Sequence, residues 1–207
     1  MVSFIKGATT QRSMKDRFHH LLKVISSPRF LQKESLGNEV PFFICDYRPE
    51  EAVEMAKLQK QLMRKLSQLN VHVLHVDLYD LAIELLQRRG IWKDVLETET
   101  TVSKDELLEL LQGVLDPETH LAPAIAEKMK ESPFDVLFLT GVGDVFPYIR
   151  SHNVLHNLQR IAKDKPTLLF FPGMYTLASE TGASLDLFGR LNDDKYYRAF
   201  NIQHFEV

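Results

Sequence analysis

Four short, nearly continuous apolar runs, each separated from the next by helical sequence, constrain this chain more than any other feature. The runs are Val40–Asp46, Val71–Asp77, Phe134–Gly141 and Thr167–Gly173. Continuous apolar strands are typical of a parallel sheet whose two faces are both covered by helices. We therefore predict an α/β fold, in which one three-layer domain surrounds a mostly parallel central sheet of about five strands.

The carboxyl ends of these strands carry small or acidic residues, which is where open α/β sheets bind their ligands. A phosphate site there would need a glycine-rich loop and a lysine, and the sequence contains no G-x-x-x-x-G-K-[ST] motif. The expected domain is therefore P-loop-NTPase-like or Rossmann-like but lacks a phosphate loop. Its predicted strand-end rim consists of Asp46, Asp77, Thr140, Gly141, Gly143 and Asp144, with Gly173 beside them.

Two interpretations of the rim compete, one structural and one chemical. Gly141-Val-Gly143 lacks the third glycine of a dinucleotide fingerprint, so a tight turn is favoured over a cofactor site. Asp46 and Asp77 directly precede helical sequence, so helix capping is favoured over Mg²⁺ binding. A metal-dependent hydrolase using Asp46, Asp77 and Asp144 is the weakest hypothesis. No catalytic residue, cofactor or metal ligand is predicted.

Three further side chains have reactive chemistry but an ordinary structural explanation. On a strand only His75 and Asp77 share a face, so His72 does not join them in a ligand set. His75 is expected to be a hydrogen-bonded core histidine. Cys45, the only cysteine, lies inside an apolar strand and is expected to be an inert buried thiol.

The charge distribution divides the predicted single domain, residues 1–207, into three parts. Residues 1–35 carry a net charge of +5 and form a basic helical leading segment, whereas the remainder carries −8. The basic segment is expected to dock on its own chain, with nucleic acid or an acidic partner as alternatives. Residues 36–183 form the α/β core, and residues 184–207 form a C-terminal interaction segment.

Local signals place several smaller elements within these parts. A helix is expected at about 11–26, and Ser103 with Glu106 forms a capping box that begins another. We interpret Ile91–Val102 as a connection anchored by Trp92, and Pro172–Ser184 as a loop. Arg198–Gln203 is expected to form a fifth strand.

A late set of basic and aromatic side chains has the composition of a protein interface. The same composition suits an element that packs on its own sheet, and the sequence leaves both interpretations open. The candidate partner-binding residues are Arg150, His152, Phe188, Arg190, Lys195, Tyr196, Tyr197 and Arg198.

The overall composition is that of an ordinary soluble domain. The chain has 207 residues, of which 44% are hydrophobic and 26% charged. No apolar run approaches the ~18 residues of a membrane span, and no secretory signal is apparent. We expect a cytoplasmic protein with no membrane partner.

Five long segments together resemble the BrxB family of BREX (bacteriophage exclusion) defence systems. They are Leu36–Tyr47, Val76–Asp80, Gly113–Pro117, Thr140–Asn153 and Ser184–Ile202. The resemblance covers the chain from about residue 15 to its end, and its motifs are long and specific.

The resemblance implies a role in a defence system more than a reaction. It suggests a non-enzymatic accessory subunit that binds other BREX components, above all PglZ, the alkaline-phosphatase-like protein of these systems. DNA would be contacted only indirectly or weakly, and an unpaired strand edge would allow a homodimer. The alternative is a degenerate nucleotide- or DNA-binding protein of the same system.

Overall fold

Five parallel strands form the central sheet in the computed structural model of the protein, which describes residues 12–33, 41–178, 182–189, 191–197 and 199–207. Their order across the sheet is β2-β3-β4-β1-β7. All neighbours in this order run parallel, and Phe43 of β1 pairs with Leu168 of β4. The strands are β1 (Phe42–Tyr47), β2 (Val73–Asp77), β3 (Val136–Thr140), β4 (Thr167–Ala178) and β7 (Phe200–Asn201).

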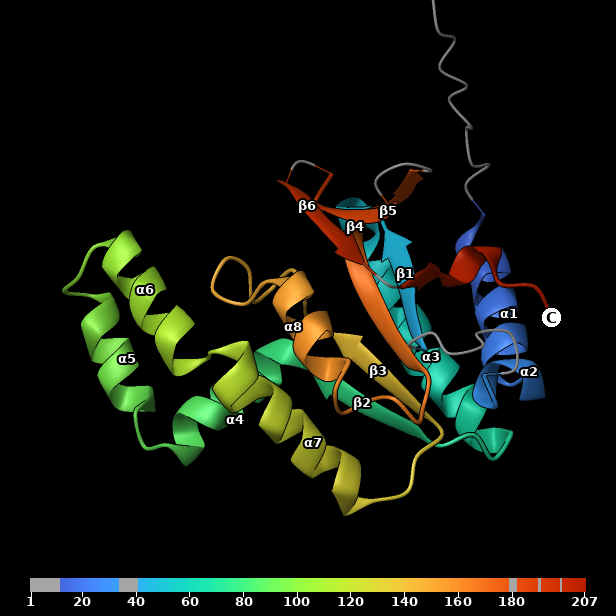
Figure 1. Ribbon diagram of the computed structural model, residues 1–207, viewed down its shortest axis with the longest axis horizontal. Coiled ribbons are helices and arrows are strands. Elements are labelled where there is room, and N and C mark those ends of the chain that lie inside the picture. Colours follow the sequence, from blue (N-terminus) through green and yellow to red (C-terminus); the bar gives the residue numbers. More distant parts are fainter. Residues whose placement is uncertain (1–11, 34–40, 179–181, 190, 198) are drawn as a thin grey trace, which may run out of the picture.

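Helices cover both faces of this sheet, so the predicted three-layer α/β architecture is confirmed (Figure 1). One face is covered by α1 (Met14–Ile25), α2 (Pro28–Leu31) and α3 (Ala52–Gln68). The other is covered by α4 (Leu78–Arg88), α7 (Ala122–Glu131) and α8 (Ser151–Leu158). Three single turns, η1 (Pro49–Glu51), η2 (Pro117–Leu121) and η3 (Ile202–His204), complete the connections.

The alternation of side chains along each strand divides the core in two. Phe42 and Ile44 pack into the α4, α7 and α8 layer, whereas Phe43 and Cys45 pack into the α1 and α3 layer. Successive residues of a strand point to opposite faces, so a strand covered on both sides has to be apolar at every position. This explains the unbroken apolar runs of the sequence.

The basic leading segment docks on its own chain over its described residues, as predicted. The apolar residues Leu21, Val24 and Ile25 of α1 are fully buried in the α3 layer. Basic side chains of the segment contact the C-terminal residues: Lys23 of α1 donates to the carbonyl of Val207, and Arg29 of α2 donates to that of Glu206. Residues 1–11 lie outside the described residues.

The segment Ile91–Val102 is a helix and not the predicted connection. It forms α5 (Trp92–Glu99), which pairs with α6 (Lys104–Val114) in a helical hairpin that projects from one end of the sheet (Figure 1). The sequence of α5 offers only Val95 and Leu96 as a short apolar stripe, too little to indicate a helix. The other apolar side chains of this contact come from α4 and α6. The predicted capping box at Ser103 and Glu106 is confirmed and begins α6.

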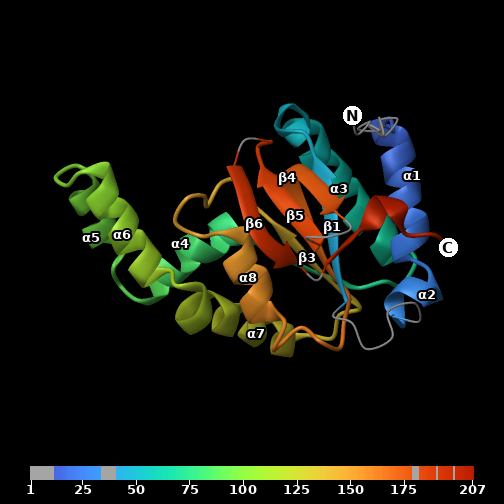
Figure 2. The same ribbon diagram turned by 45° about the horizontal axis from the view of Figure 1, so that its top comes forward.

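The predicted loop Pro172–Ser184 is also wrong. Strand β4 continues to Ala178 and then pairs antiparallel with β5 (Gly182–Leu187), which pairs with β6 (Leu191–Tyr197). Figure 2 shows β4, β5 and β6 side by side in this three-stranded extension. Glycines suggested a loop here, yet a side chain at Gly173 would lie 2.1 Å from the backbone oxygen of Asp186. Gly173 therefore allows the close pairing of β4 with β5. The strand predicted at Arg198–Gln203 is present as β7 but is limited to Phe200–Asn201, because Ile202–His204 forms η3.

Candidate functional site

The predicted rim exists at the carboxyl ends of the parallel strands, but it consists of two separate groups of side chains. Asp77 ends β2 and Asp46 lies near the end of β1, with β3 and β4 between them. Three strand spacings separate them by roughly 14 Å. They also point to opposite faces, because Asp77 alternates with Val76 and Asp46 shares its face with Ile44.

The first group is a hydrogen-bonded chain of Asp77, Thr140 and His75. The hydroxyl of Thr140 donates to Oδ2 of Asp77 at 2.7 Å, and Nε2 of His75 lies 2.9 Å from that hydroxyl oxygen. The other carboxylate oxygen of Asp77 accepts from the backbone N–H groups of Tyr79 and Asp80. Asp77 therefore caps α4, as predicted, and its two oxygens are occupied by the chain itself.

His75 is not the core histidine that we expected. It lies on β2, the edge strand of the sheet, and the residue is exposed, although its ring is partly shielded on the side of Thr140. This burial lowers its pKa from the usual 6.5, against the opposing attraction of Asp77 and Asp80. His75 is therefore expected to be neutral in the folded protein at pH 7.

We predict that the imidazole of His75 titrates with a midpoint below 6.5. As pH falls, His75 of the unfolded chain is protonated before His75 of the folded protein. Its protonation therefore lowers the unfolding free energy below pH 6.5 and has no effect above that pH. The His75 resonance in a proton NMR titration gives the midpoint directly. His75→Gln should weaken the acid destabilisation without removing it, because His20 is shifted in the same direction. A midpoint above 6.5 would contradict the prediction.

The turn after β3 is structural. Gly141 has φ +74°, and a Cβ there would lie 2.5 Å from Oδ1 of Asp77. Gly143 lies against Pro172 and the ring of Phe188. The next helix in the chain, α8, begins only at Ser151, so the turn does not lead directly into a helix as a dinucleotide fingerprint requires. The turn is packed against its own chain.

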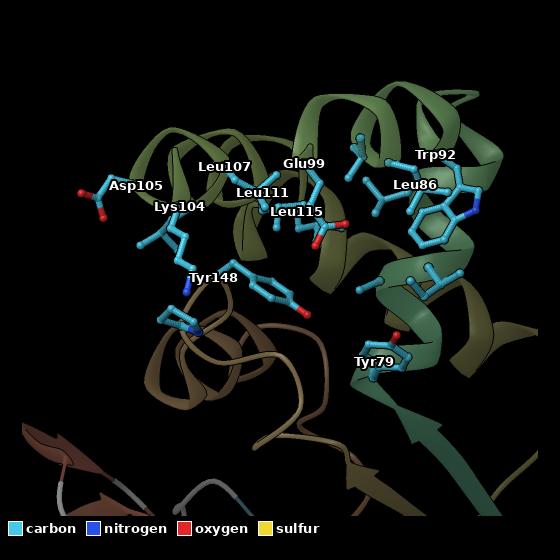
Figure 3. Close-up of a pocket in the computed structure, with 16 residues that line it drawn as sticks. Tyr79, Leu86, Trp92, Glu99, Lys104, Asp105, Leu107, Leu111, Leu115 and Tyr148 are labelled. Atoms are coloured by element: carbon cyan, nitrogen blue, oxygen red, sulfur yellow. The ribbon is translucent and has the colours of Figure 1, made fainter. Parts of the chain in front are cut away.

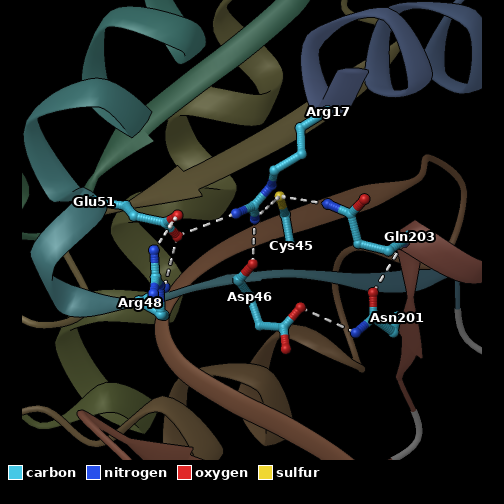
Figure 4. A network of polar contacts seen from close by, with 7 residues as sticks. All are labelled: Arg17, Cys45, Asp46, Arg48, Glu51, Asn201 and Gln203. Atoms are coloured by element: carbon cyan, nitrogen blue, oxygen red, sulfur yellow. Dashed lines mark hydrogen bonds and ion pairs between the residues drawn. The ribbon is translucent and has the colours of Figure 1, made fainter. Parts of the chain in front are cut away.

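The second group surrounds Asp46 and connects α1, β1, α3 and the C-terminal segment (Figure 4). The carboxylate of Asp46 accepts from the backbone N–H of Tyr175 at 3.1 Å and from Nδ2 of Asn201 at 3.0 Å. The expected capping role of Asp46 is therefore wrong. The helix after β1 instead begins at Arg48, whose backbone N–H donates to Glu51.

Arg17 is the buried cation of this group. Its guanidinium donates to the backbone carbonyl of Asp46 and to Oε2 of Glu51 at 3.4 Å, and it contacts the sulfur of Cys45. Only 6% of Arg17 is exposed. Sequence reasoning counted Arg17 only toward the net charge of +5 of residues 1–35 and missed this role, since the apolar stripe of α1 does not show which polar residue turns inward.

Cys45 is buried, as predicted, and burial raises the pKa of its thiol to about 11. At pH 8 only about one thiol in a thousand would then be ionised. We expect native protein to react with a thiol reagent such as DTNB only as fast as it unfolds, and at once in denaturing urea. Since Cys45 is the only cysteine, the whole signal comes from it. Fast, stoichiometric labelling of the native protein would contradict this expectation.

Asp144 is the remaining acidic residue of the predicted rim, and Tyr47, the last residue of β1, lies near it. Burial raises the pKa of Tyr47 to about 12, and the charges of Asp144 and Asp77 add to the shift. Asp144 is exposed, and its backbone oxygen accepts from the hydroxyl of Tyr148 at 3.2 Å. Over the described ranges, no three His, Cys, Asp or Glu side chains gather in a way that could hold a metal ion.

The candidate partner-binding residues do not all lie on one accessible surface. Arg150 is exposed just before α8, and Phe188, 36% exposed, lies at the β5–β6 turn with its ring edge-on to Phe146. His152 is only 8% exposed, so we remove it from the candidate interface. Lys195, Tyr196 and Tyr197 belong to β6, but their side chains lie outside the described part, as do Arg190 and Arg198.

Sequence reasoning did not anticipate an apolar groove between α4 and the α5–α6 hairpin (Figure 3). The turn containing Pro147 and Tyr148 closes one side of it, and its volume is about 520 Å³. Trp92, which we expected to anchor a connection, lines the groove instead. The available signal was the leucine stripe of α6, which includes Leu107, Leu108 and Leu111 and predicts an apolar contact surface without showing what covers it.

Among the described residues, no helix combines the length and the apolar character needed to span a membrane. A comparison with solved structures finds no match. Comparisons with protein families and curated proteins do identify relatives, which agree with the sequence resemblance noted above.

The family model described as "BREX protein BrxB" matches residues 74–202. The chain is similar to a BREX protein BrxB of Bacillus cereus (strain H3081.97), at 33% identity over 92% of this chain and 98% of that protein. It is also similar to a BREX protein BrxB of Escherichia coli O9:H4 (strain HS), at 29% identity over 90% of each chain. The chain therefore belongs to the BrxB family, whose members are proteins of BREX phage-defence systems.

Proposed function

We propose that this protein is a non-catalytic accessory subunit of a BREX phage-defence complex and that it binds PglZ. The observation that carries the proposal is that the chain itself occupies the acidic side chains of the rim. The carboxylates of Asp77 and Asp46 accept hydrogen bonds from their own chain, at the place where α/β enzymes bind substrate. Family membership supplies the defence context.

Strand β6 supports the location of the partner site. It pairs with β5 and with no other strand of the described structure, so one of its edges is unpaired. An unpaired edge offers backbone N–H and C=O groups to a partner strand, and adjoining side chains supply specificity. The sequence of β6 includes Lys195, Tyr196 and Tyr197, and tyrosine in particular is common at interfaces.

The alternative of nucleic-acid binding has less support. Several basic side chains of the leading segment contact their own chain: Lys23, Arg29 and Lys33 donate to backbone carbonyls. A DNA-binding surface would instead leave such cations free for phosphates.

The test is size-exclusion chromatography with multi-angle light scattering, on this protein alone and mixed with PglZ of the same system. We expect a co-eluting complex whose mass is the sum of its parts. The double variant Lys195→Glu/Tyr197→Ala should lose it, whereas Lys57→Glu, an exposed site on α3, should retain it. Absence of a complex at about 50 μM of each protein would contradict the proposal, because a micromolar complex survives there.

A further inference from the structure

The groove between α4, α5 and α6 has an apolar floor that the chain leaves uncovered. Leu96 and Tyr79, at 44% and 45% exposed, are among the most exposed large apolar side chains of the described structure, and both line it. Helix α6 contributes Leu107, Leu108 and Leu111 to the lining, yet none of its residues is buried. A concave site lined mainly by apolar side chains is the usual form of a binding site.

The helical hairpin that forms one side of the groove is acidic. The α5–α6 hairpin, residues 92–114, contains six acidic and two basic residues, a net charge of −4. Three charged side chains line the groove itself: Glu99 and Asp105 are acidic, and Lys104 is basic (Figure 3). The rest of the acidic set is Asp94, Glu97, Glu106 and Glu109. A ligand with positive charges beside an apolar face would complement this surface.

The walls of the groove are helices, which decides the shape of that ligand. An exposed strand edge would favour an extended peptide, but α4, α5 and α6 offer ridges of side chains, into which another helix packs. A fourth helix would bury the leucines of α6 together with Leu96 and Tyr79. It would also place its flanking residues beside Glu99 and Asp105.

We propose that this groove binds an amphipathic α-helix of a partner protein, apolar on one face and carrying Lys or Arg along its flanks. The site is separate from β6, so the proposal goes beyond the PglZ-binding role and does not depend on it. The helix anchors at the apolar floor through residues spaced i, i+3, i+4 and i+7. The basic residues along its flanks face Glu99, Asp105 and the other acidic residues of the hairpin, and this charge pairing sets the orientation of the bound helix.

Trp92 makes the proposal directly measurable, because it is the only tryptophan of the chain and lies in the groove. The probe is a synthetic helix of about 18 residues built from Leu, Ala and Lys, with an apolar stripe and lysine flanks. A second peptide keeps the stripe and replaces every lysine with glutamate. Neither contains an aromatic residue, so tryptophan emission reports only Trp92.

We expect the lysine peptide to shift the Trp92 emission saturably, with a Kd on the order of 10 μM. The glutamate peptide should bind at least about tenfold more weakly, and Glu99→Lys/Asp105→Lys should weaken the lysine peptide by a similar factor. Leu96→Asp should abolish binding. Val53→Asp is the matched control, because Val53 is 64% exposed on α3, away from the groove, and should bind as the wild type does. Circular dichroism checks that each variant is folded.

Three results would overturn the proposal. The first is no saturable change of the Trp92 emission with the lysine peptide up to about 1 mM, because a Kd above that concentration would mean negligible binding. The second is equal binding of both peptides, or of Leu96→Asp and the wild type. The third is a dimer of the isolated chain that Leu96→Asp converts to a monomer, since a second copy would then be the occupant. A failed PglZ complex would leave these outcomes unaffected.

Discussion

Replacing Arg17 with alanine is expected to lower the free energy of unfolding by about 3 kcal/mol, a large fraction of the stability of an ordinary domain. The guanidinium is buried and connects α1 to the backbone of β1 and to Glu51 at the start of α3. Without the guanidinium, the carbonyl of Asp46 loses this donor. The nearly buried carboxylate of Glu51 also loses one of its cations. An unsatisfied buried polar group costs more than the hydrogen bond itself contributed.

Urea unfolding followed by circular dichroism measures this loss. Arg48→Ala is the matched control, because Arg48 contacts the same carboxylate of Glu51 at 3.1 Å, but its side chain is 61% exposed. Solvent screens an exposed pair, so this variant should lose only about 0.5 kcal/mol. If the two variants were equally stable, burial would not be what makes the Arg17 contacts important.

The second large effect is expected at Gly141, where alanine should cost about 3 kcal/mol of unfolding free energy. Part of the cost is the positive φ of +74°, which a Cβ disfavours by about 1 kcal/mol. The larger part is the position of that Cβ, 2.5 Å from Oδ1 of Asp77. Asp77 cannot move away without losing Thr140 and the cap of α4.

Two other glycines separate these contributions. Gly90 has φ +72°, but no atom lies within 4 Å of the place that a Cβ would occupy, so Gly90→Ala should cost only about 1 kcal/mol. Gly113 lies within α6 at ordinary φ with open space around it, and Gly113→Ala should stabilise by about 0.5 kcal/mol. Equal effects at Gly141 and Gly90 would show that Asp77 yields easily and that the rim is not tightly held.

The two-sided apolar character of β1, β3 and the first half of β4 could be predicted from the sequence because periodicity is a local property. The same holds for the capping box at Ser103 and the cap at Asp77, where the acceptor and the N–H groups are two or three residues apart. The family relationship could also be predicted, since long motifs identify it without any geometry.

The elements that sequence reasoning missed are those whose partners are distant in the chain. Helix α5 is stabilised by apolar contacts with α4 and α6, and β5 exists because β4 continues past the rim to pair with it. The side chain of His75 was expected in the core, but the strand order places β2 at an edge. Strand order depends on how the crossovers pack, which no local pattern encodes.

The sequence by itself determined the α/β class, the parallel strands and the position of the rim at their carboxyl ends, because each follows from a local pattern. It also determined the BrxB family, because long motifs identify it. Only the tertiary structure decided which rim residues meet. It joined Asp77 to Thr140 across 63 positions and Asp46 to Asn201 across 155, on opposite faces of the sheet. It also left the leucines of α6 beside an open groove. Contacts between distant residues depend on strand order and packing, and these form only when the whole chain folds.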